Sequence, residues 1–310
     1  MNENLKAVSL FCGCGGLDIG FHRVGIRTIF ANDFSKDACE TYRKWNPSAE
    51  VVCGDVGEIP ESSIPDCDAI LGGFPCQGFS LAGPRRIDDS RNLLYRHYVR
   101  IVRAKKPKVF VGENVKGILT MDGGRIIDAI VREFSDCGYD VFYKLVNAKN
   151  YGVPEDRLRV IITGFRKDLG VRGFILPETN GRGSTIEEAL EGIPFSEDEL
   201  CTESYSPRYM SRNRRRGWND VSFTIPAMAK QTPLHPSSPL MEKIDRELFR
   251  FGLEGRTRRF TWRECAAIQT FPKEMEFVGK LDEIYRQIGN AVPPLLAESV
   301  AESVKERLIG

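Results

Sequence analysis

Residues 6–18 read Lys6-Ala7-Val8-Ser9-Leu10-Phe11-Cys12-Gly13-Cys14-Gly15-Gly16-Leu17-Asp18, and in them an apolar strand runs directly into a glycine-rich turn. We predict a strand over residues 6–11 and a helix from about Gly16. A glycine turn between a first strand and a first helix lets a nucleotide-like ligand lie against the backbone. The glycines do not match the GxGxxG spacing. An NAD enzyme, an S-adenosylmethionine enzyme and a plain loop therefore all remain open at this point.

Strand and helix patterns alternate through the first half of the chain. Short apolar runs predict strands, and apolar residues at helical spacing between them predict helices. The predicted strands are residues 6–11, 28–32, 51–53, 68–71, 109–111, 140–146 and 158–165. This alternation predicts an α/β fold with a doubly wound, mostly parallel, Rossmann-like sheet and helices on both faces.

The pattern changes after about Gly170, where glycine, proline, serine and arginine become frequent and periodicity weakens through about Arg258. Regular pattern returns after Pro293-Pro294, which opens a last helix with one apolar face. We expect this helix to pack back on the first domain. The expected division is one large domain from residues 1–170 and 286–310, and a second, smaller, loop-rich domain from residues 171–285.

The composition, with 41% hydrophobic and 28% charged residues among 310, is that of an ordinary globular protein. Nine cysteines without a CxxC pair indicate free thiols in a reducing compartment. The three histidines are scattered, so we expect no metal site. No segment approaches a membrane-spanning run and the N-terminus lacks a signal sequence, which predicts an intracellular protein without a membrane partner.

The net charge of +1 conceals local basic clusters. Five arginines fall within residues 208–216, and Arg256, Arg258 and Arg259 follow later. Local basic patches bind phosphate regardless of global charge. For either cluster alone, a solvated face with arginine-rich turns explains the pattern about as well.

A proline–cysteine pair, Pro75-Cys76, follows the predicted strand 68–71 within a glycine-rich stretch. A cysteine just past the end of a parallel strand stands where open α/β sheets place their ligands. Pro75 fixes its own φ and restricts Phe74, so the turn that presents the thiol is stiff. Cys76 is a candidate nucleophile. The alternative is that Cys76 is a buried structural cysteine, and this alternative would be favoured if no other motif accompanied it.

Charged residues follow several of the other predicted strands. Asp33 and Asp55 end the second and third strands, and a carboxylate after the second strand commonly holds ribose hydroxyls. Glu113 follows strand 109–111, where burial would raise its pKa and make it a proton donor; a loop carboxylate is the alternative. Arg157 and Arg159 are two apart, so in an extended segment both guanidiniums face the same way and suit phosphate or a polar base edge.

Taken together, these motifs resemble those of the DNA cytosine-C5 methyltransferases, in order and across nearly the full length. The matching segments are Phe11 to Gly16, Gly73 to Ser80, Glu113-Asn114-Val115, Tyr151 to Pro154 with Arg157 and Arg159, Arg259 to Pro272, and Tyr285 to Val292. One departure is Glu155, which stands where the family commonly has glutamine.

The resemblance implies S-adenosylmethionine as cofactor and a covalent mechanism. Cys76 would add to C6 of cytosine while Glu113 hydrogen-bonds or protonates N3, Arg159 would hold the carbonyl side of the base, and Arg157 would support the loop or the thiolate. The cofactor-binding residues implied are Phe11, Gly13, Gly15, Gly16, Leu17, Asp33, Phe34, Asp55, Val56, Leu94 and Asn290.

The resemblance also implies double-stranded DNA as substrate, with the target cytosine flipped out of the duplex. Residues 77–91 would close over the flipped base, and residues 171–285 would recognise the DNA sequence. The DNA-binding residues expected are Gln77, Ser80, Arg208, Arg212, Arg214, Arg215 and Arg216.

Three alternatives compete with this interpretation. One branch of the family methylates transfer RNA, but an arginine-rich recognition region of nearly ninety residues favours duplex DNA. An inactive DNA-binding member is disfavoured because Cys76, Glu113, Arg157 and Arg159 are all present. An NAD oxidoreductase leaves Pro75-Cys76 and the closing motif unexplained. The single compact chain resembles prokaryotic modification enzymes, which implies a cytoplasmic monomer and a possible cognate restriction endonuclease that acts on the same site without direct contact.

Overall fold

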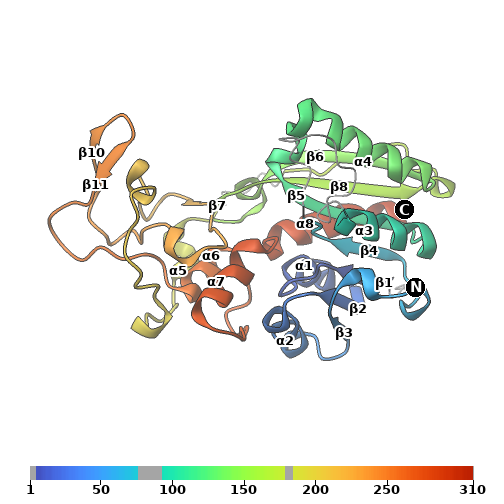
Figure 1. Ribbon diagram of the computed structural model, residues 1–310, viewed down its shortest axis with the longest axis horizontal. Coiled ribbons are helices and arrows are strands. Elements are labelled where there is room, and N and C mark those ends of the chain that lie inside the picture. Colours follow the sequence, from blue (N-terminus) through green and yellow to red (C-terminus); the bar gives the residue numbers. More distant parts are fainter. Residues whose placement is uncertain (1–4, 76–92, 179–183, 310) are drawn as a thin grey trace.

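The computed structural model describes residues 5–75, 93–178 and 184–309. A seven-stranded sheet forms the larger lobe, and a lobe with little regular structure stands beside it (Figure 1). The strands of the large sheet are β1 (Leu5–Leu10), β2 (Ile26–Asp33), β3 (Glu50–Cys53), β4 (Ala69–Gly72), β5 (Val109–Val115), β6 (Tyr139–Asn147) and β8 (Leu158–Arg166).

The sheet has the order β3-β2-β1-β4-β5-β8-β6. Five neighbouring strands run parallel, and β8 is antiparallel to both β5 and β6. The predicted α/β fold with a mostly parallel sheet is therefore confirmed. The strand order reverses between β1 and β4, and open sheets of this kind bind ligands beyond the carboxyl ends of the strands at such a point.

Helices cover both faces of the sheet. They are α1 (Gly16–Arg23), α2 (Lys36–Trp45), α3 (Leu93–Lys105), α4 (Arg125–Asp136) and α8 (Pro294–Ile309). Alternate residues of each strand point to opposite faces, so Ala69 and Leu71 pack with α1 and α8 while Ile70 packs with α3 and α4.

The last helix packs back on the first lobe, as its sequence predicts. An added Cβ at Gly20 of α1 would lie 2.4 Å from the backbone nitrogen of Glu298 in α8, so the glycine is what allows the two helices to approach this closely. Helix α8 thereby joins the apolar core formed by α1, β1, β4 and β5.

The second lobe contains short elements joined by long loops (Figure 1). These elements are β7 (Glu155–Asp156), α5 (Ile186–Leu190), β9 (Ser222–Phe223), β10 (Glu242–Asp245), β11 (Leu248–Arg250), α6 (Trp262–Ile268) and α7 (Leu281–Asn290). β7 pairs with β9, and β10 with β11. No helix among the described residues is both long and apolar enough to span a membrane.

Helices α6 and α7 connect the two lobes. Their buried side chains, such as Cys265 and Ile288, pack in one cluster with Cys14 and Ile19 of the first lobe. The domain boundary expected between residues 285 and 286 falls inside α7. A loop-rich second domain over residues 171–285 remains a proposal, and this cluster is the place where it meets the sheet domain.

Candidate active site

A cavity of about 490 Å³ opens at the carboxyl ends of β1 and β4. The turn from β1 to α1 forms one wall, with Phe11, Gly13, Gly16 and Leu17. Phe11 has φ 54° and Gly13 has φ 53°, and the left-handed region is uncommon for a residue with a side chain. An added Cβ at Gly13 would meet nothing within 4 Å, so this turn presents open backbone to a ligand.

Carboxylates and apolar side chains complete that part of the cavity. Asp33, at the end of β2, accepts hydrogen bonds from the backbone N–H groups of Gly13 (2.8 Å) and Ser35 (2.9 Å). Burial raises the pKa of Asp33, and the bonds from Ser35 and Gly13 oppose that rise. Phe34, which is 78% exposed, and Leu94 also line the cavity. The wall thus combines hydrogen-bond acceptors with flat apolar surface.

Asn290 lies on the opposite wall with its neighbours Ala291 and Val292. The closing motif therefore meets the glycine turn, and an added Cβ at Gly16 would lie 2.3 Å from the carbonyl oxygen of Val292. Three other residues expected to bind a cofactor lie outside the described wall of the cavity. Gly15 packs against Trp45, the Asp55 carboxylate accepts from the Gly57 N–H at 2.8 Å, and the Val56 side chain is buried.

Glu113 projects into the same cavity from β5. Its Oε1 lies 2.8 Å from Nε of Arg159, which enters from the antiparallel neighbour β8. Burial raises the pKa of Glu113, while the positive charges of Arg159 and Arg157 oppose that rise. Burial and the neighbouring Arg157 lower the pKa of Arg159 to about 10. A carboxyl group with a raised pKa holds its proton more tightly than a free one, which suits a proton donor.

Arg157 has a different environment from Arg159, although the two are only two residues apart. Its guanidinium is fully buried and donates to the carbonyl oxygens of Ile225 (3.1 Å), Gly289 (2.7 Å) and Ala291 (2.9 Å). It also forms an ion pair with Glu155 at 3.3 Å. Arg157 is therefore bonded to backbone, and Arg159 is the arginine that pairs with the cavity residue Glu113.

The segment that leads to the candidate nucleophile lines the cavity as well. Gly73, Phe74 and Pro75 form part of its wall, and an added Cβ at Gly73 would lie 3.5 Å from Oε2 of Glu113. Asn114 donates to the carbonyl oxygen of Phe74 at 2.8 Å, which ties this segment to β5. Cys76, Gln77, Ser80 and the expected closing loop 77–91 lie outside the described residues.

Asp18 was not predicted from the sequence, although it also lines the cavity. The fully buried carboxylate accepts hydrogen bonds from Thr28 (2.7 Å), Ser9 (2.9 Å) and Tyr42 (3.0 Å). Burial raises its pKa to about 6, against the effect of these three bonds. The sequence signal was an acidic residue in the first turn of a helix, a position common for purely local reasons. Glu283, Arg286 and Gln287 line the cavity too, from α7.

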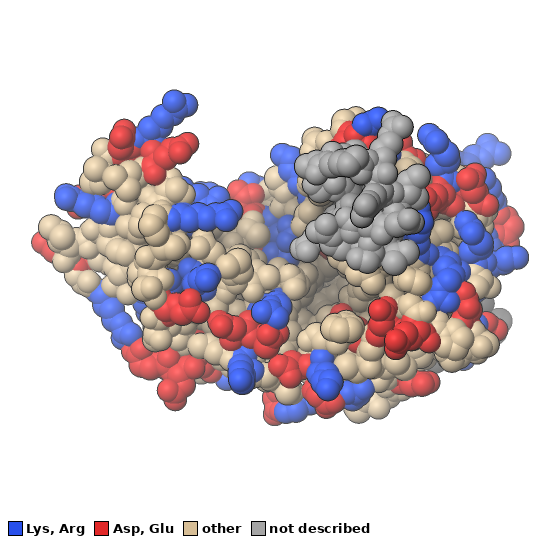
Figure 2. Space-filling model, in the orientation of Figure 1, with Lys and Arg blue, Asp and Glu red and all other residues tan. Residues whose placement is uncertain are grey.

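A second cleft, of about 880 Å³, lies in the smaller lobe. It is lined by four arginines and a lysine, namely Arg208, Arg212, Arg214, Arg216 and Lys230. Figure 2 shows a hollow between the two lobes, with lysine and arginine side chains along the smaller lobe beside it. Among the described residues, this cleft is a concentration of positive charge suited to phosphate.

The five arginines of residues 208–216 divide into two groups. Arg214 is buried and donates to the carbonyl oxygens of Tyr209 (2.9 Å) and Arg208 (3.1 Å). Arg215 does not line the cleft and donates to the carbonyl oxygens of Pro236 (2.7 Å) and Ser238 (3.0 Å). The other three, Arg208, Arg212 and Arg216, line the cleft, and Arg216 stacks over the Phe223 ring at 4.2 Å.

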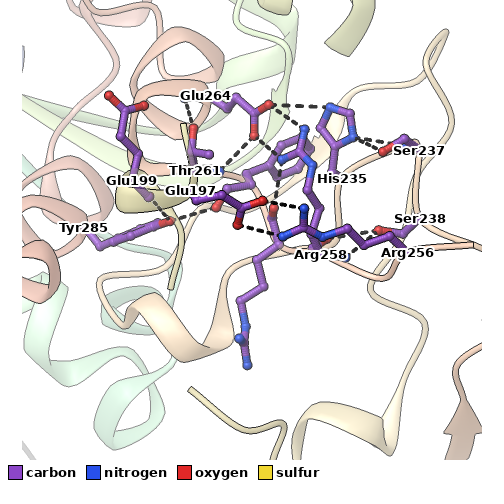
Figure 3. A network of polar contacts seen from close by, with 12 residues as sticks. Glu197, Glu199, His235, Ser237, Ser238, Arg256, Arg258, Thr261, Glu264 and Tyr285 are labelled. Carbon is purple, nitrogen blue, oxygen red and sulfur yellow. Dashed lines mark hydrogen bonds and ion pairs between the residues drawn. The ribbon is translucent and has the colours of Figure 1, made fainter. Parts of the chain in front are cut away.

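A buried polar network supports the smaller lobe (Figure 3). Its centre is Glu264 of α6, which caps the helix with Thr261 and accepts two hydrogen bonds from Arg258, at 2.7 and 2.8 Å. His235 lies 3.6 Å from Glu264, and burial lowers its pKa to about 4, so it is neutral at physiological pH. Tyr285 of α7 donates to the Phe260 carbonyl at 2.8 Å.

The sheet order and the ligand-sized cavity at its switch point define a Rossmann-like α/β fold with a candidate ligand site, in which a cavity residue, Glu113, pairs with Arg159. Two solved structures share this fold over nearly their whole lengths. A putative DNA modification methyltransferase encoded within an E. coli prophage aligns with a TM-score of 0.78 at 24% identity, covering 99% of this chain and 100% of that one. The Entamoeba histolytica methyltransferase EhMeth aligns with a TM-score of 0.78 at 18% identity, covering 100% of both chains.

The sequence comparison is more specific. Residues 5–306 match the C-5 cytosine-specific DNA methylase family, and the chain belongs to that family. It is 42% identical to the Type II methyltransferase M.FnuDI of Fusobacterium nucleatum, over 98% of this chain and 95% of the relative. It is 39% identical to the Type II methyltransferase M.NgoPII of Neisseria gonorrhoeae, over 98% of this chain and 96% of the relative. The predicted family and enzyme class are confirmed.

Proposed function

We propose that this enzyme transfers a methyl group from S-adenosylmethionine to C5 of a cytosine flipped out of a specific duplex DNA sequence, through a covalent adduct with Cys76. The observation that carries the proposal is the juxtaposition of Glu113 and Pro75 in one cavity with the glycine turn, with Arg159 paired to Glu113. Family membership supports cytosine C5 as the acceptor atom.

The cavity fits S-adenosylmethionine in its chemistry. Asp33 supplies acceptors for ribose hydroxyls, Phe11, Phe34 and Leu94 supply apolar surface for a purine, and the open backbone at Gly13 suits the methionine end. When bound, the cofactor supplies a methyl group activated by a sulfonium. We assign binding to these residues, to Gly16, Leu17 and Asn290, and, on resemblance alone, to Gly15, Asp55 and Val56.

The catalytic roles follow from charge and position. Cytosine C5 is a weak nucleophile, so the ring needs activation. The Cys76 thiolate adds to C6, Glu113 places a proton at N3, and Arg159 orients Glu113 and the carbonyl side of the base. After C5 has been methylated it loses its proton to a base, the N3 proton returns to Glu113, the Cys76 sulfur leaves C6 as the thiolate, and the C5–C6 double bond returns. Burial raises the pKa of Glu113, which favours the protonated carboxyl group that delivers the proton to N3.

The DNA would lie in the hollow between the lobes, with the recognition lobe reading the sequence. Arg208, Arg212 and Arg216 line the cationic cleft and are proposed to contact phosphates or guanine edges. Arg214 and Arg215 are proposed to act as supports for those contacts, since their guanidiniums already bind backbone carbonyls. Gln77 and Ser80, next to the nucleophile, are proposed DNA contacts on resemblance alone.

The relatives' names support a role in a type II restriction–modification system. A cognate restriction endonuclease would act on the same DNA site without binding this chain. We propose a monomer in the cytoplasm of a prokaryotic cell, working without a metal ion. Among the described residues, no group of three or more histidine, cysteine or acidic side chains is arranged to hold a metal ion.

Bisulfite sequencing tests the function directly. Purified protein is incubated with S-adenosylmethionine and a duplex DNA library of diverse sequence, and the product is sequenced for 5-methylcytosine. Methylation confined to one short motif is expected, and it also identifies the recognition sequence. No methylation of DNA by a folded protein that binds the cofactor, together with methylation of transfer RNA, would contradict DNA as the substrate.

A further inference from the structure

Glu155 and Arg157 form a fully buried ion pair between the two lobes. Glu155 begins β7, and Arg157 is the one residue between β7 and β8. Removing two charges from water is costly unless hydrogen bonds and a counter-charge compensate. Two apolar residues could fill the same space without this desolvation cost. Stability alone therefore does not explain the ion pair at this position.

The pair holds three separate backbone segments together. Oε1 of Glu155 accepts from the N–H of Ile225 at 2.6 Å, and Arg157 donates to the carbonyl of the same residue at 3.1 Å. The other guanidinium nitrogen of Arg157 donates to the carbonyls of Gly289 and Ala291. This pair of side chains thus joins three segments: the recognition segment (residues 222–226), the start of β8, and the end of α7.

Other contacts reinforce the same meeting point. Thr224 donates to the carbonyl oxygen of Asp156 at 2.6 Å, and Ser222 donates its N–H to the carbonyl of Pro154 at 2.8 Å. An added Cβ at Gly289 would lie 2.3 Å from the carbonyl carbon of Pro226, so α7 touches the recognition segment directly. We call Glu155, Arg157 and the backbone of residues 222–226 and 289–291 the joint.

The joint lies beside groups assigned to chemistry on both sides. Arg159, two residues along β8, pairs with Glu113, and Asn290 lines the cofactor cavity between the two carbonyls that Arg157 holds. Thr224 and Pro226 line the cationic cleft together with Arg216. Two carboxyl groups, Glu113 and Glu155, thus face two guanidiniums, Arg157 and Arg159, across the joint.

We propose that the Glu155–Arg157 pair is a positioning element that sets the recognition segment and the Glu113–Arg159 pair in register for methyl transfer. This inference rests on the proposed function. In the usual family pattern a neutral glutamine stands at position 155; here a carboxylate adds a charge to the hydrogen bonds. Neither side chain touches substrate, so both act through the residues they hold.

The central test replaces Arg157 by lysine. One ammonium cannot reach three carbonyls and a carboxylate with the fixed fork of a guanidinium. Misplacing catalytic groups by about 1 Å costs about 100-fold, so we expect Arg157→Lys to lower the single-turnover rate constant by about 30- to 100-fold. The measurement uses saturating cognate DNA and S-adenosylmethionine, and the rate is normalised to active sites by titration. Cofactor and DNA affinities should change by less than about threefold.

Matched variants separate positioning from general destabilisation. Arg166→Lys changes an arginine at the far end of β8, whose partners are the exposed Asp168 and a backbone carbonyl, and it should leave the rate constant unchanged. Glu155→Leu should be as slow as Arg157→Lys. Glu155→Gln keeps an acceptor oxygen for Ile225 and should be at least about tenfold faster than Glu155→Leu. Amide exchange of residues 222–225 should also accelerate in Arg157→Lys.

The outcomes are distinct. An inactive wild-type protein contradicts the proposed function, whereas an active wild type with folded Arg157→Lys and Glu155→Leu variants at the wild-type rate constant overturns the positioning role alone. If neither variant folds, Thr224→Val removes one bond of the joint. It should be about three- to tenfold slower at saturating DNA. A wild-type rate constant in Thr224→Val would then overturn the inference.

Discussion

The two lobes hold their candidate functional side chains in place in different ways. In the larger lobe, Glu113 and Arg159 sit on neighbouring strands whose ladder fixes their separation. Among the described residues of the smaller lobe, regular pairing is limited to two short two-stranded sheets, and arginines bonded to carbonyls take the place of the ladder. The contrast shows that arginines bound to backbone carbonyls can hold loops together where a strand ladder is missing, while Arg208, Arg212 and Arg216 line the cleft that we propose for DNA.

The largest expected effect is a loss of methyl transfer from a change in the larger lobe alone. Cys76→Ala should lower methyl transfer by more than about 10³-fold, since no other group replaces the nucleophile. Cofactor affinity, measured by calorimetry, should stay within about threefold because the thiol is assigned to the base. Cys137 is a partly buried thiol that accepts a hydrogen bond from Arg103, and the Cys137→Ala variant is the control, which should retain full activity. Loss of cofactor binding in a folded Cys76→Ala would count against the assigned roles.

The next effect addresses the stability of the smaller lobe (Figure 3). Arg258→Ala leaves the buried Glu264 carboxylate without its bidentate partner and should lower the free energy of unfolding by about 3 kcal/mol. Arg256→Ala is the matched control, because its partner Glu197 is exposed to solvent and the pair is screened. Urea unfolding measures both. Equal losses in the two variants would show that burial does not distinguish these pairs.

The buried acid of the larger lobe predicts a pH dependence. The pKa of Asp18 is raised to about 6, above the value near 3.9 of an unfolded chain, so the folded state binds this proton more tightly. Stability from this group is present at low pH and is lost as the pH rises through about 6. The difference in unfolding free energy between wild type and Asp18→Asn should therefore fall by about 2 kcal/mol from pH 4 to pH 8. A flat difference would contradict a buried, titrating Asp18.

The smallest effect divides the arginines within the smaller lobe. Arg216→Ala should weaken DNA binding by about tenfold and reduce the slope of log affinity against log salt by about 1. Arg215→Ala should lower the melting temperature and leave that slope unchanged, since its guanidinium holds the carbonyls of Pro236 and Ser238. Fluorescence anisotropy at several salt concentrations measures the slope. If Arg215→Ala changes the slope and Arg216→Ala does not, the division is reversed.

Several features were predictable from the sequence because their signals are local. The glycine turn after the first strand, the strand and helix alternation, and the last helix after Pro293-Pro294 follow from patterns within a few residues, and the structure has all three. The acids at the ends of strands were predictable as well, since parallel strands deliver their carboxyl ends to one edge of the sheet.

Other features depended on contacts between residues far apart in the chain. The arginine cluster gave no indication that Arg214 and Arg215 turn toward backbone carbonyls, because those carbonyls come from other loops. From the sequence, Asp18 is only an acidic residue at the start of a helix. The structure shows that its carboxylate is bonded to Ser9, Thr28 and Tyr42.

The sequence by itself thus determined the family, the sheet and the chemical identity of the Glu113 and Arg159 groups, since these are carried by motifs in fixed order. Only the tertiary structure decided that Arg159 rather than Arg157 pairs with Glu113, and that Glu155 and Arg157 join segments more than sixty residues apart. The physical reason is that a buried charge finds its partners in three dimensions, and neither its burial nor its counter-charge is written in the neighbouring residues.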